Sequence, residues 1–127
     1  MKNKYFFPSY IYGILVLISS SLNPERLEKI QESNNFFDII LSDYSLHFFA
    51  YGIFAVFLFY GFYKIKRFPI PFVRIGLYST AYGLFIEIYQ IALPYRAFNI
   101  KDLISDIVGI TAFLVIIRVF ILKRIMN

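Results

Sequence analysis

Four apolar stretches, separated by shorter polar connectors, make up most of the chain. They run from about residue 5 to 22, 44 to 63, 70 to 93 and 103 to 122. Each approaches the roughly 20 residues that an α-helix needs to cross the hydrocarbon core of a bilayer. The pattern therefore predicts an all-α membrane protein, a bundle of four transmembrane helices forming a single domain over residues 1–127.

The connector after the first stretch is the longest, and it carries helix signals of its own. Asn23-Pro24-Glu25 combines an N-cap residue, a proline suited to a first turn and an acid. Leu27 and Ile30 then form one apolar edge. We expect a short helix here that lies on the membrane surface.

The first stretch has a second interpretation, as a cleaved signal peptide. Lys2 and Lys4 give it a basic start, and Ser19-Ser20-Ser21 places small residues near a cleavage point. The apolar run is long for a signal peptide, however, and no A-x-A-like site follows it. We retain the transmembrane interpretation and leave cleavage as the alternative.

The basic residues predict the orientation of the bundle. With both termini in the cytoplasm, nine of the 13 lysines and arginines fall on the cytoplasmic side, as the positive-inside preference requires. All eight acids then fall on the outer side. We therefore predict a multi-pass membrane protein with both termini inside the cell.

Composition narrows the class of protein further. Hydrophobic residues make up 59% of the chain and charged residues 17%, which is more apolar than an ordinary soluble domain. The absence of cysteine excludes disulfides, thiolate metal sites and thiol catalysis. The net charge of +5 comes without a basic stripe interleaved with base-stacking aromatics, so we expect no nucleic-acid partner.

Polar side chains that interrupt the apolar stretches are the candidate functional residues. An ionisable group at membrane depth costs several kcal/mol, at about 2.5–3.5 by the mildest scales, so it is a functional candidate by default. The predicted topology brings all of these residues to the outer leaflet, where we expect one shallow polar pocket. They are Asp43, His47, Tyr51, Glu87, Gln90, Arg96, Asp102 and Asp106.

Helical spacing indicates which way these side chains point. Asp43, His47 and Tyr51 lie four residues apart and share one face. Glu87 shares its face with two small residues, Ser79 and Gly83. Because small residues at this spacing mark the packing face of a membrane helix, Glu87 should point into the bundle. A third face carries Asp102, Asp106 and Gly109.

His47 and Glu87 are the candidate catalytic residues, for general acid/base chemistry. His47 is the single histidine, and it is either a hydrogen-bonded structural residue or an acid/base group oriented by Asp43. Asp43 could instead simply cap its helix. Glu87 is either an acid/base group or one half of a structural ion pair with Arg96.

The remaining candidates are predicted to contact substrate. Arg96 presents a planar fork suited to a phosphate or carboxylate, unless it only anchors the outer loop. Asp102 lies in a first helical turn, where the helix dipole alone would favour an acid. Asp106 lies one turn deeper, and Gln90 and Tyr51 are supporting hydrogen-bonding groups. These assignments put Asp43, Tyr51, Gln90, Arg96, Asp102 and Asp106 in the substrate-binding set.

Metal binding receives little support from the spacing of these residues. Carboxylates and one imidazole suit Mg²⁺, Mn²⁺ or Zn²⁺. No H-E-x-x-H or other recognised ligand spacing is present, however. We therefore predict neither a metal ion nor another cofactor.

The order of the polar residues resembles that of the VanZ-like family of small bacterial membrane proteins. The resemblance covers about the last 85 residues and rests on the combined order of motifs that are individually weak. The motifs are Asp43-x-x-x-His47, Glu87-x-x-Gln90, Pro94-x-Arg96 and Asp102-x-x-x-Asp106-x-x-Gly109. Two positions depart from the family pattern: Tyr44 stands where lysine is frequent, and Asp106 where asparagine is usual.

The resemblance implies a cell-envelope protein of the bacterial cytoplasmic membrane, and the predicted topology makes its functional pocket face outward. The family is named for a protein associated with low-level teicoplanin resistance, which implies a link to glycopeptide resistance. The expected partners are membrane lipids and a lipid-linked cell-wall precursor.

Three functions are compatible with this picture. The first is binding of a polar or anionic head group in the outer-leaflet pocket, and the second is a membrane-embedded enzyme acting on such a head group. The third is proton-linked transport or lipid movement, since intramembrane carboxylates suit proton relays. The inner halves of the predicted helices carry no acids, so a relay would need a homo-oligomer to complete it.

Overall fold

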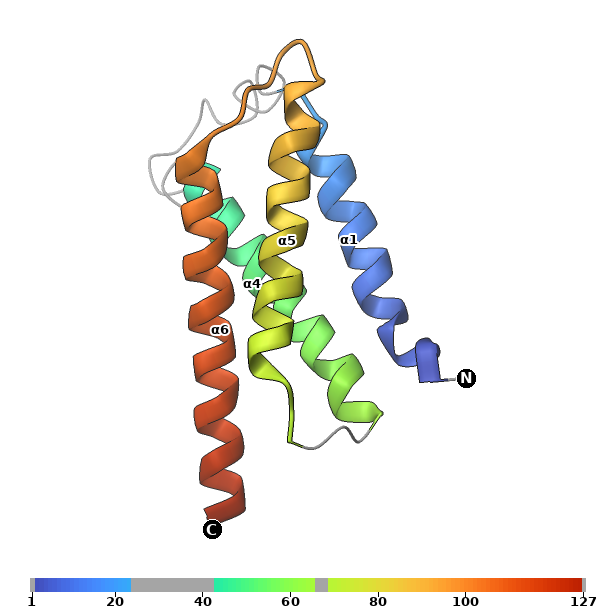
Figure 1. Cartoon of the computed structure of the whole chain (residues 1–127), viewed down its shortest axis with the longest axis vertical. Coiled ribbons are helices and arrows are strands. Elements are labelled where there is room, and N and C mark those ends of the chain that lie inside the picture. Colours follow the sequence, from blue (N-terminus) through green and yellow to red (C-terminus); the bar gives the residue numbers. More distant parts are fainter. Residues whose placement is uncertain (1, 24–42, 66–68, 127) are drawn as a thin grey trace, which may run out of the picture.

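The computed structural model describes residues 2–23, 43–65 and 69–126, and every regular element in these ranges is helical. In the described part of the chain, the prediction of an all-helical protein is confirmed. Figure 1 shows the arrangement. The elements are a 3₁₀-helix η1 (Lys2–Phe6) and the α-helices α1 (Phe7–Ser20), α4 (Asp43–Lys64), α5 (Phe72–Ile91) and α6 (Ile100–Met126).

The helices occupy the four predicted stretches, with the largest difference in α6. This helix extends beyond the predicted range of 103 to 122 at both ends. An acid, Asp102, lies in its first turn, and Lys123 and Arg124 lie in its last turn. These charges suit the helix dipole, so they continue the helix after the apolar pattern has ended. The surface helix expected between residues 23 and 43 falls outside the described residues.

The four helices are arranged so that the polar ends of three of them meet. Figure 1 shows α5 and α6 side by side, α4 crossing behind them at an angle, and α1 flanking the other side. Helix α4 packs most extensively against α6. Both termini lie toward the end of the bundle opposite the α5–α6 loop. Three helix ends therefore lie at the same end of the bundle: the start of α4, the end of α5 and the start of α6. The C-terminal end of α1, which includes Ser20, lies there too.

The distribution of polar and apolar side chains differs from that of a soluble bundle. Large apolar side chains are exposed on every α-helix, including Val73 at 77% and Phe120 at 70%. Polar side chains are buried instead, namely Ser9, Ser79, Glu87, Gln90, Asp102 and Asp106. An extended exposed apolar surface favours contact with lipid or another apolar partner.

Two helices, α4 and α6, are long and apolar enough to cross a membrane. Helix α1 has 14 residues, which span about 21 Å at 1.5 Å per residue, less than the roughly 30 Å of a hydrocarbon core. Helix α5 has 20 residues, but buried polar groups such as Glu87 and Gln90 interrupt its apolar sequence. The structure thus supports two candidate spans, while the four-span bundle stays a prediction.

Helices α4 and α6 approach each other very closely at Gly109. A Cβ atom at this position would overlap the main-chain carbonyl of Phe48. A main-chain atom cannot move aside as the end of a flexible side chain can. The approach of the two helices therefore depends on the missing side chain of Gly109.

We expect Gly109→Ala to destabilise the protein by about 1–3 kcal/mol, the usual cost of overpacking a tight contact. The matched control is Gly76→Ala, because a Cβ atom there would meet only Leu114 Cδ1, at 3.7 Å. This control should be neutral or stabilising, since alanine favours helix by about 1 kcal/mol over glycine. Thermal unfolding of both variants in detergent micelles measures the difference, and equal midpoints would contradict the close approach.

Candidate functional site

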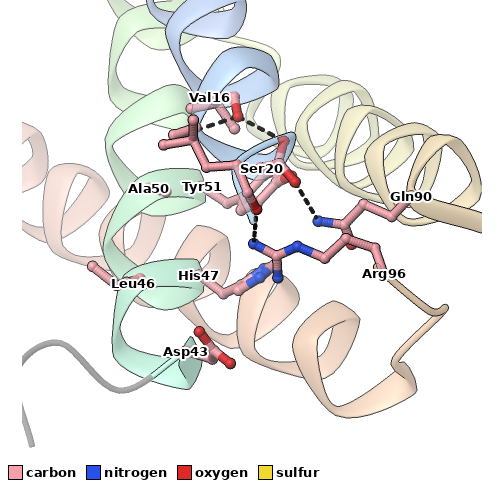
Figure 2. Close-up of a pocket in the computed structure, with 11 residues that line it drawn as sticks. Val16, Ser20, Asp43, Leu46, His47, Ala50, Tyr51, Gln90 and Arg96 are labelled. Carbon is pink, nitrogen blue, oxygen red and sulfur yellow. Dashed lines mark hydrogen bonds between the residues drawn. The ribbon is translucent and has the colours of Figure 1, made fainter. Parts of the chain in front are cut away.

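A cavity of about 230 Å³ opens among the end of α1, the start of α4, the end of α5 and the loop that follows α5. Figure 2 shows the residues around it. Five of the eight predicted site residues lie on its wall, together with residues of α1. The lining residues are Val16, Ser19, Ser20, Leu22, Asp43, Leu46, His47, Ala50, Tyr51, Gln90 and Arg96.

Hydrogen bonds to main-chain carbonyls hold the end of α1 in place beside this cavity. The dashed lines in Figure 2 include two of these bonds. The donors reach it from the end of α5 and the following loop: Gln90 Nε2 to Ser20 (3.1 Å), Arg96 Nη2 to Leu22 (3.1 Å) and Tyr95 Oη to Ser21 (2.6 Å). The wall formed by α1 is thus attached to the part of the chain that carries Gln90 and Arg96.

His47 lies between the cavity and a group of carboxylates. Its Nδ1 atom is 2.8 Å from Asp106 Oδ1, and its Nε2 atom is 3.8 Å from Asp102 Oδ2. The imidazole also stacks on the Tyr51 ring, with centroids 5.9 Å apart and an interplanar angle of 15°. Contacts on both nitrogens and one face give the ring a defined orientation.

Asp106 therefore takes the role of orienting His47, which one of the two interpretations gave to Asp43. Asp43 is the first residue of α4 and its side chain is exposed. In the described part of the chain, the ion pairs of His47 are with Asp102 and Asp106. Sequence spacing favoured the residue one turn away on the same helix, whereas the packing of α6 against α4 brings a carboxylate closer.

Glu87 is fully buried, as its face with Ser79 and Gly83 predicts. Its Oε2 atom accepts a hydrogen bond from the Asn99 main-chain N–H at 3.0 Å. Its Oε1 atom has no hydrogen-bond partner among the described residues. Among the described residues Glu87 does not form the ion pair with Arg96 that was the alternative interpretation, because the Arg96 guanidinium turns toward the end of α1.

The predicted single pocket is thus two adjoining groups of residues joined by His47. One group lines the cavity and comprises Asp43, His47, Tyr51, Gln90 and Arg96. The other group lies behind His47 and comprises Glu87, Asp102 and Asp106, all of them buried. We call this second group the acid cluster.

Sequence reasoning missed the contribution of α1, namely Val16, Ser19, Ser20 and Leu22. One signal was available, because Ser19-Ser20-Ser21 is a polar run at the end of an apolar stretch. It was interpreted only as a feature of a cleavage site. The Asn99 bond to Glu87 was also missed, and a main-chain donor leaves no trace in the sequence.

Spacing also did not reveal a possible metal-ligand group. His47, Glu87 and Asp106 each offer one ligand atom, and these three atoms lie within 4.8 Å of one another. The residues come from three different helices, so no short motif could have shown them together.

Comparison with known proteins identifies a family. The model of the family described as VanZ/LLP1 matches residues 6–122. The match is wider than the resemblance in residue order, which begins at Asp43, and it includes α1. Comparison with curated proteins and with solved structures gave no match.

We expect Nδ1 of His47 to carry a hydrogen that is donated to Asp106. Since His47 is the only histidine, ¹⁵N-histidine NMR of the protein in micelles gives a single imidazole to assign. Asp106→Asn keeps an acceptor oxygen and should retain this state. Asp106→Ala should lose it and cost about 1–3 kcal/mol of stability, because a buried partner is left unpaired. Asp43→Ala is the control and should leave the tautomer of His47 unchanged. If Asp43→Ala changed the tautomer and Asp106→Ala did not, the pairing of His47 with Asp106 would be contradicted.

Proposed function

The chain belongs to the VanZ/LLP1 family, and we propose that this VanZ-like cell-envelope protein binds the polar or anionic head group of a membrane lipid or lipid-linked cell-wall precursor. The observation that carries the proposal is the position of Arg96 on the wall of the cavity. The cavity is proposed to open at the outer leaflet of a bacterial cytoplasmic membrane.

The placement in the membrane is supported by the exposed apolar surface together with the buried polar groups. Helices α4 and α6 supply two candidate spans, and we propose that α1 with η1 and α5 complete a four-span bundle. Basic residues then lie mainly at the end of the bundle that carries both termini, which the positive-inside preference places in the cytoplasm. The cavity lies at the opposite end.

Arg96 supplies the charge that an anionic head group needs. One of its Nη atoms is bonded to the Leu22 carbonyl, while its buried Nε atom has no partner among the described residues. A guanidinium has five N–H donors, and beside a cavity those not bonded to Leu22 suit a phosphate or carboxylate, which they bind through charge-assisted hydrogen bonds. His47 and Gln90 add further polar groups on the same wall.

The size of the cavity limits what can enter it. Sites that enclose a whole drug-sized ligand measure about 300–1,000 Å³, and this cavity measures about 230 Å³. It can therefore hold the charged part of a head group, while the rest of the ligand stays in the lipid or in water. This is the arrangement expected for a molecule that is itself anchored in the membrane.

The link to glycopeptide resistance is proposed from the resemblance in residue order. A protein that occupies an envelope head group changes what a glycopeptide drug meets at the membrane surface. Expression of the chain in a susceptible bacterium should then lower teicoplanin susceptibility, and Arg96→Gln should abolish the effect. Unchanged susceptibility would remove resistance from the proposal without affecting head-group binding.

Arg96→Gln tests head-group binding directly. In nanodiscs of mixed phosphatidylglycerol and phosphatidylcholine, we expect the wild-type protein to retain phosphatidylglycerol selectively. Loss of a charge-assisted hydrogen bond, about 1.5–3 kcal/mol, weakens that retention by about tenfold or more. Native mass spectrometry of the lipid-bound protein measures it.

The matched control is Arg118→Gln, since Arg118 is an exposed arginine in the C-terminal half of α6. It removes the same charge at a distance from the cavity and should leave selectivity unchanged. Equal selectivity in the Arg96 and Arg118 variants would show that head groups do not bind through this cavity.

A second candidate function is catalysis on such a head group, and the position of His47 favours it. The imidazole faces the cavity while Asp106 fixes it from behind, which is the relation of an acid/base group to its orienting residue. Incubation of pure protein with envelope lipids and wall precursors, followed by mass spectrometry, distinguishes turnover from binding. Product that forms with wild type and not with His47→Gln would establish an enzyme.

A further inference from the structure

The acid cluster brings three acidic side chains together in the interior of the bundle. Glu87 and Asp106 are 0% exposed and Asp102 is 7% exposed. In the described part of the chain, the only charged partner within 4 Å of these carboxylates is His47. A buried carboxylate without a partner is costly, and paired or metal-bound carboxylates are the arrangements in which buried charge persists.

Several oxygen atoms of the cluster also lack hydrogen bonds. Glu87 Oε1, Asp106 Oδ2 and Asp102 Oδ1 are buried without a partner among the described residues. Each belongs to a side chain at least nine-tenths buried. The second oxygen of Glu87 is held by the Asn99 N–H, so the carboxylate is oriented while Oε1 stays available. Buried oxygen atoms without hydrogen-bond donors suit a metal ion, which accepts their electron pairs, better than they suit a hydrogen-bond network.

The distances suit a single ion. Ligand atoms of His47, Glu87 and Asp106 lie within 4.8 Å of one another. Nitrogen and oxygen ligands bind Zn²⁺ at about 2.0–2.2 Å, so two ligands on one ion lie about 3–4 Å apart. The widest of these separations must shorten by about 1–2 Å for the group to close around an ion of this size.

We propose that His47, Glu87 and Asp106 bind a divalent transition-metal ion of the Zn²⁺ or Mn²⁺ class, with Asp102 beside them as a further carboxylate. Asp102 is included as a neighbouring carboxylate because its Oδ2 atom is 3.8 Å from His47 Nε2. The imidazole favours Zn²⁺ over Ca²⁺ and Mg²⁺, which prefer oxygen ligands, while the carboxylates also suit Mn²⁺. Three carboxylates and one divalent ion leave a smaller buried charge than three carboxylates alone.

Gly83 makes room for this arrangement on α5. A Cβ atom at residue 83 would lie 2.7 Å from Asp106 Oδ2 and 3.3 Å from the Tyr51 ring. The unpartnered oxygen of Asp106 therefore reaches α5, the helix that carries Glu87. The three ligands come from α4, α5 and α6, so the ion would link the three helices.

The metal site and the head-group cavity share His47 but otherwise use different residues. None of Glu87, Asp102 and Asp106 lines the cavity, whereas Arg96 lines it and has no part in the ligand group. Loss of head-group selectivity in an Arg96 variant and loss of metal in a Glu87 variant are therefore independent results.

The experiment uses the full-length protein, stripped with chelator and exchanged into metal-free detergent buffer. Zn²⁺ and Mn²⁺ are titrated separately by calorimetry, and Ca²⁺ is the oxygen-preferring control. We expect one Zn²⁺ or Mn²⁺ per chain and a shift of the single histidine ¹⁵N signal on addition of Zn²⁺. Glu87→Gln and Asp106→Asn, which are near-isosteric, should each weaken binding by at least about tenfold.

Asp43→Asn is the matched control, because it removes an equal charge from an exposed residue one turn from His47. It should leave metal affinity unchanged. The proposal is overturned if wild type shows no stoichiometric binding, which means that protons rather than a metal neutralise the acid cluster. It is equally overturned if Glu87→Gln and Asp106→Asn, shown by circular dichroism to be folded, bind as tightly as wild type.

Discussion

The close approach of α4 to α6 at Gly109 is the constraint on which the rest of the site depends. The Phe48 carbonyl lies where a side chain of residue 109 would be, and the neighbouring residue His47 is thereby brought to 2.8 Å from Asp106, one turn before Gly109. The imidazole then separates a cavity wall from three buried acids. A wider spacing of the two helices would leave His47 without its carboxylate, and would remove the one basic side chain within 4 Å of Asp102 and Asp106 in the described chain.

Much of this could be predicted from the spacing of residues along single helices. Four-residue repeats showed which side chains share a face, and the small residues Ser79 and Gly83 correctly indicated that Glu87 points inward. The order of motifs was enough to recognise the family. What spacing could not supply was the pairing between helices, because it says nothing about their crossing angle or separation. Spacing therefore offered His47 only Asp43 as an orienting partner, and metal binding was set aside because no short motif joins His47, Glu87 and Asp106.

The contribution of α1 to the cavity could not be predicted for a different reason. Val16 and Leu22 follow an apolar pattern that does not distinguish a membrane span from a cavity lining, and the serines between them were interpreted as part of a cleavage site. The bonds that hold it end on main-chain carbonyls of Ser20, Ser21 and Leu22, and every residue has such an acceptor. A sequence records the donors, Gln90, Tyr95 and Arg96, while their targets become visible only when the fold brings the chain ends together.

Attachment through main-chain acceptors has an evolutionary consequence. The hydroxyls of Ser19 and Ser20 bond only to carbonyls within α1, so these two residues can be exchanged without breaking the bonds that tie the main chain of α1 to the rest of the bundle. The opposite wall has no such freedom, because His47 and Tyr51 are fixed by stacking and by the acid cluster. Substitutions on the α1 side of the cavity thus leave the chemistry of the opposite wall intact.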